Sequence, residues 1–140
     1  MARCRDIILD SSVVGKWFST ETKSDEAHKF LDSYIQGTVE LTISEILICE
    51  VSNALRYKPD YDTQKWKTAL THLFNLHMNV THLNENLTIR TGEIAFDGKI
   101  TFYDALPVAI AENRKTVCIT ADEDTQFKKL QPKGYPIELL

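Results

Sequence analysis

The sequence predicts a three-layer α/β domain with a mostly parallel central sheet. Two observations carry this prediction. Short apolar or alternating runs that suit strands are separated by longer segments in which apolar residues recur every three or four positions, as in amphipathic helices. In addition, the first run, Ile7-Ile8-Leu9, is continuously apolar and stops abruptly at Asp10, as a strand buried on both faces would. We expect Asp10 at the carboxyl end of that strand, where open α/β sheets form ligand crevices.

The expected elements follow one another without a linker or an internal repeat. Ser11 or Ser12 can cap a short first helix, while Ser44 and Asn84 can cap later ones. Pro59 and the turn at 97–99 end two of the helices. In order, we expect strands at 7–9, 39–43, 78–83, 116–120 and 135–139, and helices after Asp10 and at 21–35, 45–57, 63–76, 84–96, 101–113 and 123–130.

Length and composition suit a single globular domain over residues 1–140, since 43% of the residues are hydrophobic and 26% are charged. A net charge of −4 argues against binding nucleic acid by bulk electrostatics alone, unless a metal or a partner supplies positive charge. The three widely spaced cysteines favour a reduced protein over a disulfide scaffold or a zinc site. The N-terminal apolar run is too short for a signal peptide or a membrane span, so we expect a cytoplasmic protein without membrane contact.

Glu50 is a carboxylate in apolar surroundings, where a charge needs a partner or a function. On the helix at 45–57 it lies at the edge of the apolar arc and away from the solvated side, and Asn53 flanks the same edge. An ion pair at the seam between helix and sheet explains Glu50 as well as a functional role does.

Asp104 is the one charge in the first part of the nearly all-apolar helix at 101–113. In the first turn the helix dipole favours an anion, so Asp104 fits either a structural role or a ligand site. Pro107 would remove a backbone hydrogen bond, and we therefore expect the regular helix to begin nearer Asp104.

The strand at 116–120 ends as the first strand does, because Thr120 is followed closely by Asp122 and Asp124. Asp122 also fits the N-cap of the short helix that follows, and Asp124 fits its solvated first turn. If the two strands are neighbours, Asp10 and Asp122 lie about one strand spacing apart, roughly 5 Å plus a small offset.

The four carboxylates would repel one another if they met without a cation. A divalent metal ion removes this conflict, and Mg²⁺ and Mn²⁺ take oxygen ligands. One or two such ions can activate a water molecule and stabilise the leaving oxygen in phosphodiester cleavage, which predicts a metal-assisted nuclease. The four histidines share no metal-ligand spacing with the acids, and we interpret them as surface or packing residues.

The motifs around these acids resemble those of a known family. ILDSS contains Asp10, CEVSNAL contains Glu50, YDALPVAIA contains Asp104 and ITADEDTQF contains Asp122. In this order they resemble the acidic quartet of the PIN domain, and within that family the chain is most similar to VapC-like toxins of type II toxin–antitoxin pairs. The resemblance implies a parallel sheet with the first strand central and a Mg²⁺- or Mn²⁺-dependent endoribonuclease that cleaves RNA.

The resemblance also implies partners and residue roles. It implies a homodimer, for which the helices at 21–35 and 63–76 are candidate surfaces, and inhibition by a cognate antitoxin protein. It assigns metal binding and catalysis to the acidic quartet, which is Asp10, Glu50, Asp104 and Asp122. Ser11 and Thr120 fill polar positions beside the metal, Asn53 takes a commonly polar helix position, and Asp124 either substitutes for Asp122 as a metal ligand or assists it.

Other interpretations fit less of the sequence. An aspartyl phosphatase needs a second Asp where Ser12 stands, and a receiver domain needs a phosphoacceptor Asp near His82. Two alternatives remain. One is a PIN-like RNA-processing nuclease, and the other is a catalytically silent scaffold or binding domain that acts through a partner. The intact quartet disfavours the silent domain. Candidate RNA contacts at the crevice mouth, each of which also fits a solvated helix end, are Arg56, Lys58, Arg114 and Lys115.

Overall fold

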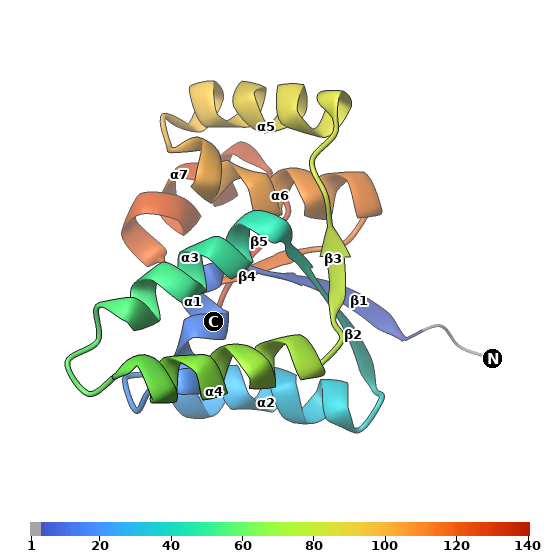
Figure 1. Ribbon diagram of the computed structural model, residues 1–140. Helices are drawn as coiled ribbons and strands as arrows, with labels where there is room; N and C mark the ends of the chain where they lie inside the picture. Colours follow the sequence, from blue (N-terminus) through green and yellow to red (C-terminus); the bar gives the residue numbers. More distant parts are fainter. Residues whose placement is uncertain (1–3) are drawn as a thin grey trace.

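A computed structural model describes residues 4–140, so residues 1–3 of the expected domain lie outside the described residues. Its centre is a sheet of five strands in the order β3-β2-β1-β4-β5. Every neighbouring pair of strands is parallel. Helices lie on both sides of this sheet (Figure 1), which confirms the predicted three-layer fold with the first strand central.

The elements alternate along the chain as the sequence predicts. In order they are β1 (Arg5–Leu9), α1 (Ser11–Val14), the 3₁₀ turn η1 (Gly15–Phe18), α2 (Ser24–Ile35), β2 (Val39–Ser44), α3 (Glu45–Arg56), α4 (Thr63–Asn75), β3 (Asn79–Thr81), α5 (Glu85–Gly98), α6 (Phe102–Arg114), β4 (Cys118–Thr120), the π-helical turn η2 (Glu123–Phe127), α7 (Lys128–Leu130), the 3₁₀ turn η3 (Gln131–Lys133) and β5 (Ile137–Leu139).

The central strand supplies both hydrophobic cores, because successive side chains of a strand point to opposite faces. Ile7 and Leu9 pack into the core beneath α1 to α4, whereas Ile8 packs into the core beneath α5 to α7. All three side chains are buried, so the continuous apolar run at the start of the sequence reflects burial on both faces. Within residues 4–140, no helix has both the length and the apolar character needed to cross a membrane.

Several element boundaries differ from the expected ones by a few residues, and the first helices and α5 show why. Asp10 itself caps α1, by accepting a hydrogen bond from the Ser12 amide, so neither serine is the cap. α2 begins only at Ser24, since Lys23 before it has the left-handed φ of 65°. α5 continues through Gly98, where a Cβ would lie 2.6 Å from Leu130 Cδ2, so glycine permits the close approach of α7.

α6 begins at Phe102 and not near Asp104, which corrects the expected start of this helix. The Thr101 hydroxyl caps it by accepting from the Asp104 amide at 3.1 Å. Pro107 is therefore inside the helix, where it removes a backbone hydrogen bond at a typical cost of about 3 kcal/mol. The helix persists because every residue from Ala105 to Ala111 is buried against the sheet and α5.

The sheet topology brings distant segments together at one edge. β1 pairs with β4 so that Leu9 lies beside Ile119, and the Asp10 amide donates to the Ile119 carbonyl at 3.0 Å. Asp10, which follows β1, and Thr120, the last residue of β4, therefore lie side by side at this edge. The amino-terminal end of α6 also lies at this edge, because the Gln126 side chain links the Asp104 carbonyl to Thr120.

Candidate functional site

The acidic quartet lines one cavity of about 280 Å³ at the carboxyl end of the sheet. Asp10 follows β1, Glu50 lies on α3, Asp104 lies in the first turn of α6 and Asp122 follows β4. The structure thus brings together four carboxylates that are far apart in sequence. The other side chains or backbone that line this cavity come from Ser11, Ser12, Gly15, Glu21, Val51, Ala54, Leu55 and Lys58.

Asp10 is buried, with 5% of its surface exposed. Ser12 holds one of its carboxylate oxygens, Oδ2, through the hydroxyl at 2.5 Å and the amide at 3.0 Å, and Gln126 Nε2 donates to Oδ1 at 3.4 Å. Burial raises the pKa of Asp10 above its ordinary value, and the charge of Asp122 adds to this effect. The hydrogen bonds from Ser12 and Gln126 oppose it without cancelling it.

Glu50 faces the cavity from the side of α3 that carries Val51, Ala54 and Leu55, as its helix position predicts. Burial raises its pKa to about 7, helped by the negative charges of Asp10 and Asp104 and opposed by a hydrogen bond from Ser11. Near neutral pH this carboxyl therefore holds its proton for much of the time.

Asp104 lies half-buried at the start of α6. Burial raises its pKa, and the charges of Asp10 and Asp122 act in the same direction. The hydrogen bond with Thr101 and the charge of Lys129 oppose this rise. The favourable interaction with the helix dipole is therefore too small to keep the pKa of Asp104 at its ordinary value.

Asp122 caps the turn η2, as its sequence position predicts, by accepting hydrogen bonds from the amide and the hydroxyl of Thr125. Its own amide donates to Thr120 Oγ1 at 3.0 Å. Asp124 points elsewhere, with 82% of its side chain exposed and an ion pair of 3.1 Å to Lys128. It does not line the cavity.

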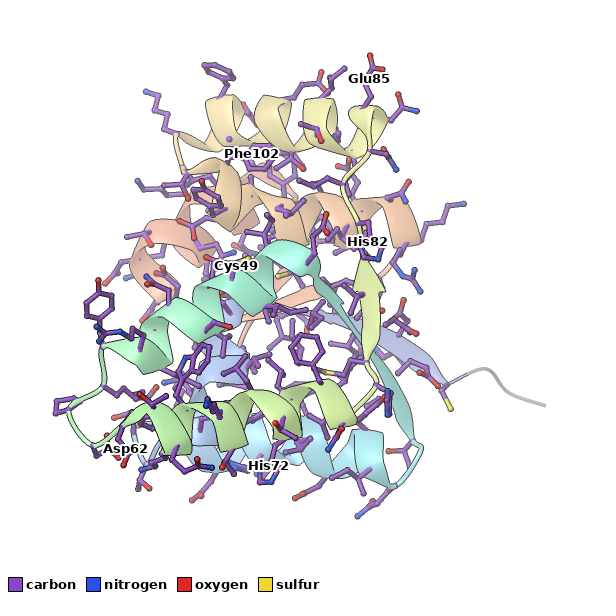
Figure 2. All side chains as sticks on the ribbon, viewed as in Figure 1. Cys49, Asp62, His72, His82, Glu85 and Phe102 are labelled. Carbon is purple, nitrogen blue, oxygen red and sulfur yellow. The ribbon has the colours of Figure 1, made fainter. Side chains whose placement is uncertain are left out.

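The three predicted supporting residues are placed differently from one another. Ser11 lines the cavity, and Thr120 is fully buried beneath it, with its hydroxyl 3.5 Å from Asp10 Oδ2. Asn53 is exposed on α3 and is absent from the cavity lining, so the structure does not bring it to Glu50. The four histidines also lie outside the cavity lining. Figure 2 shows His72 on α4 and His82 beside β3, where it contacts Glu45 at 3.0 Å.

The structure adds Ser12 and Gln126, which the sequence interpretation did not assign to the site. Besides holding Asp10, the Ser12 hydroxyl accepts from the Ala121 amide at 2.9 Å and so ties α1 to the end of β4. Gln126 is fully buried; its Oε1 accepts from Thr120 and its Nε2 donates to the Asp104 carbonyl at 2.8 Å. The sequence signal for Gln126 was its spacing of four residues from the apolar Leu130, which places both on one helix face.

Two of the four candidate RNA contacts are at the wrong end of the molecule, which corrects that expectation. Arg114 pairs with Asp6 at 2.5 Å, and Lys115 lines a hollow with Arg5 at the amino end of the sheet. Helices that join parallel strands run back across the sheet, so the end of α6 lies at the edge where β4 begins. Arg56 lines a separate hollow beside Trp66, and Lys58 is the candidate that reaches the acidic cavity.

The donor set of the cavity fits a hydrated divalent cation. Within residues 4–140, no three Asp, Glu, His or Cys side chains converge closely enough to enclose an ion by themselves. Mg²⁺ does not require such a cage, because it keeps several water ligands and is held by one or two carboxylates. Three neighbouring carboxyls with raised pKa values mark a place where added positive charge would be favourable.

The chain is similar in fold to several solved structures. No curated protein matches it. Among solved structures, a toxin–antitoxin complex from Klebsiella pneumoniae is 18% identical, with a TM-score of 0.65, over 85% of this chain and 88% of that chain. The DNA-bound VapBC from Salmonella typhimurium is 16% identical, with a TM-score of 0.71, over 96% of this chain and 98% of that chain.

A third similar structure is Mycobacterium tuberculosis VapC20, described as a Sarcin-Ricin loop cleaving toxin. It is 14% identical, with a TM-score of 0.69, over 92% of this chain and 95% of that chain. At these identities the likeness shows a shared fold. The sequence itself matches the family model of the PIN domain over residues 7–131, a range that contains the whole acidic quartet. With both the fold and most of the sequence in agreement, the chain belongs to the PIN domain family.

Proposed function

We propose that this protein is a Mg²⁺- or Mn²⁺-dependent endoribonuclease and the toxin of a toxin–antitoxin pair. One observation carries the proposal: four carboxylates from four separate elements face one cavity, and burial and mutual repulsion raise the pKa of three of them. A fold gains no stability from such an arrangement, which indicates a site that serves a ligand. Membership of the PIN domain family and the similarity in fold to VapC20 support an RNA substrate.

We distinguish residues of the site that bind metal from residues that hold those ligands in position. We assign metal binding to the acidic quartet, with Asp10 at its centre. A bound divalent ion would supply Lewis-acid charge at the scissile phosphate and lower the pKa of a water molecule. Ser12, Thr120 and Gln126 hold Asp10 in one orientation and so keep its free lone pairs directed at the cavity.

Glu50 gives this site a proton that can be followed in solution. Carboxylates coordinate metal in their deprotonated form, so uptake of metal near pH 7 should release a proton. Glu50 is the source we expect, because its pKa of about 7 leaves it partly protonated at that pH. Calorimetry in buffers of different ionisation enthalpy measures the number of protons released.

The proposed partners follow the same comparisons. Similar structures include toxin–antitoxin complexes, so we propose that an antitoxin protein binds and inhibits this chain. We also propose that the protein forms a homodimer and acts in the cytoplasm as one domain. Sedimentation of the purified chain tests the homodimer, and sedimentation with any small protein encoded by the neighbouring reading frame tests the antitoxin complex.

The decisive experiment is cleavage of total RNA by the purified chain with Mn²⁺, with Mg²⁺ and with excess chelator. We expect cleavage with metal and none with chelator, and no cleavage by the Asp10→Asn variant. Asp6→Asn, on the same strand but at its other end, is the matched control and should cleave as the unaltered chain does. If the unaltered chain neither cleaves RNA nor binds Mn²⁺ in calorimetry, the proposal is wrong and a silent binding domain is favoured.

A further inference from the structure

Two lysines and a glutamate form a cluster at the edge of the acidic cavity. Lys16 Nζ donates to Glu21 Oε1 at 3.0 Å and to the Thr22 carbonyl at 2.8 Å. Lys58 Nζ lies 3.7 Å from the other oxygen of the same carboxylate, Glu21 Oε2. We call these three residues the Lys–Glu–Lys cluster. One carboxylate is thus shared between two ammonium groups, which leaves the cluster with a net positive charge.

The two lysines hold Glu21 with unequal strength. The Lys16 side chain is only 14% exposed, and both of its contacts are hydrogen bonds. The separation between Lys58 and Glu21 exceeds hydrogen-bonding distance, and 29% of the Lys58 side chain is exposed. Lys16 therefore anchors the carboxylate, while Lys58 is paired loosely enough to take a better acceptor.

Lys58 is placed where the substrate of a nuclease needs positive charge. Among the cavity-lining residues of the described chain, it carries the single positive charge beside the four carboxylates and Glu21. Lys58 lies just beyond the end of α3, which stops at Arg56, and it lines the same cavity as Glu50 and Ala54. Its ammonium lies beside Glu21 and not beside one of the quartet, so it suits a neighbouring phosphate of the same strand better than the phosphate held at the quartet.

Glu21 has the charge of the ligand that Lys58 would bind. Although partial burial opposes ionisation, hydrogen bonds from Lys16 and Ser19 and the charges of both lysines lower the pKa of Glu21. Glu21 is therefore an anion at neutral pH. Its carboxylate lies beside the Lys58 ammonium, in the place that a phosphate oxygen would take.

We propose that Lys58 binds a phosphate flanking the one that is cleaved, and that Glu21 pairs with Lys58 until RNA displaces it. The inference rests on the proposed nuclease function and adds a backbone contact to it. The positive charge of Lys58 attracts RNA to a cavity whose carboxylates repel it. Glu21 weakens binding of isolated anions, because any ligand must compete with a carboxylate that Lys16 keeps in place.

The test is binding of a short, randomised, fluorescein-labelled single-stranded RNA, followed by anisotropy at several KCl concentrations. The measurement uses Asp10→Asn protein, which prevents cleavage. We expect Lys58→Gln to weaken binding about five- to tenfold and to reduce the salt slope by about 0.7, the value for one lost phosphate contact on a single strand. Lys58→Arg should keep most of the affinity, and Glu21→Gln should tighten binding about two- to threefold.

Lys65→Gln is the matched control. Lys65 also forms an ion pair, at 2.8 Å with Asp60, but it is half exposed on α4 and does not line the cavity. It should leave the affinity and the salt slope unchanged. In the cleaving protein, Lys58→Gln should raise KM while kcat stays within about twofold, as for a contact made equally before and during the reaction.

The outcomes separate this inference from the proposed function. If the unaltered chain cleaves RNA but Lys58→Gln and Lys65→Gln bind it equally well, the inference is wrong and the nuclease proposal stands. A lower melting temperature for Lys58→Gln with an unchanged salt slope would show that the cluster only ties the segment after α3 to the segment before α2. If the unaltered chain neither cleaves nor binds RNA, both proposals fail.

Discussion

The two ends of β1 each carry an aspartate, and the two are treated in opposite ways. Asp6 accepts from Arg114 Nε at 2.5 Å and from the Thr42 hydroxyl at 2.8 Å, so a cation and a hydroxyl both compensate its charge. Asp10 has only neutral donors, from Ser12, Thr120 and Gln126, and its charged neighbours are other carboxylates. Asp6 is also less buried, with 22% of its side chain exposed.

This difference is the one we expect between a structural carboxylate and one that serves a ligand. In a stable fold the acidic side chains are usually paired or exposed, because burying an unpaired charge is costly. The amino end of the sheet follows that rule, and Arg5 adds a weak pair of 4.0 Å with Glu138 there. The carboxyl end does not follow this rule, because burial raises the pKa of Asp10, Glu50 and Asp104. Chance burial of a single acid does not explain three such carboxyls in one cavity.

The largest expected difference between the two ends is catalytic. Asp10→Asn should lower the rate of RNA cleavage by about 10³-fold or more, since it removes the central charge of the site. Asp6→Asn should change the rate by less than about twofold, because Asp6 lies at the far edge of the sheet. Initial rates on a fluorescent RNA, at saturating Mn²⁺, measure both. Equal losses in the two variants would mean that the comparison reflects folding and not a site.

The next difference is in the response to metal. Mn²⁺ at about 100 times its dissociation constant should stabilise the unaltered protein by roughly 2.7 kcal/mol, because it binds the folded state alone. Asp6→Asn protein should gain as much, and Asp10→Asn protein much less. Thermal melts over a Mn²⁺ series give these values. A full gain in the Asp10→Asn protein would place the metal elsewhere.

Gln126 extends the comparison to a neutral residue at the acidic end. Gln126→Leu should lower stability by about 1 to 3 kcal/mol, since the Thr120 hydroxyl and the Asp104 carbonyl lose a buried partner. Cleavage should fall further than stability explains, because Asp10 also loses a donor. Gln126→Glu adds a fifth carboxyl to the site and should lower stability further in the absence of metal. Urea unfolding and cleavage rates, measured side by side, test this.

Much of the architecture was predictable because it follows from local patterns and from topology. The apolar run before Asp10, the cap at Ser44 and the alternation of strands with helices are properties of short segments. Once the sheet is parallel, residues that follow its strands must gather at one edge, which brings Asp10 near Asp122. The meeting of Glu50 with Asp104 came from the family resemblance, and their roles stay predictions.

The missed features depend on contacts between segments far apart in the chain. Gln126 lies in a π-helical turn, whose register differs from the ordinary helix that the sequence predicts there. Ser12 fits a helix cap equally well, and only the docking of β4 gives its hydroxyl a second partner at Ala121. The misplacement of Arg114 was avoidable, since a helix that crosses a parallel sheet ends at the opposite edge from its start.

The pH dependence of stability is a smaller way to sharpen the comparison. In the metal-free protein the pKa of Glu50 is raised from 4.5 to about 7, so the folded state binds more protons than the unfolded state between these values. Stability should therefore fall as pH rises through this window. We expect a loss of about 1 to 2 kcal/mol after allowance for solvent screening. Glu50→Gln should flatten the slope in urea titrations, and saturating Mg²⁺ should reverse it.

The smallest expected effect is at the amino end. Asp6→Asn should lower the free energy of unfolding by about 1 kcal/mol, because its ion pair with Arg114 is partly exposed. Asp10→Asn should instead leave stability equal or slightly higher without metal, since one repelling charge is gone. Opposite signs in urea unfolding would support the contrast between the two ends, and equal losses would contradict it.

The central position of β1 also governs when the site can exist during synthesis. Asp10 is made early, but its neighbour β4 and the Gln126 side chain that fixes it follow more than a hundred residues later. A growing chain on the ribosome can pair β1 with β2 and β2 with β3, yet it has no complete acidic cavity until β4 and η2 emerge. On the proposed function, the nascent chain therefore cannot cleave RNA before its last strands emerge. The proposed antitoxin would then have the time of translation in which to reach the chain before the cavity is complete.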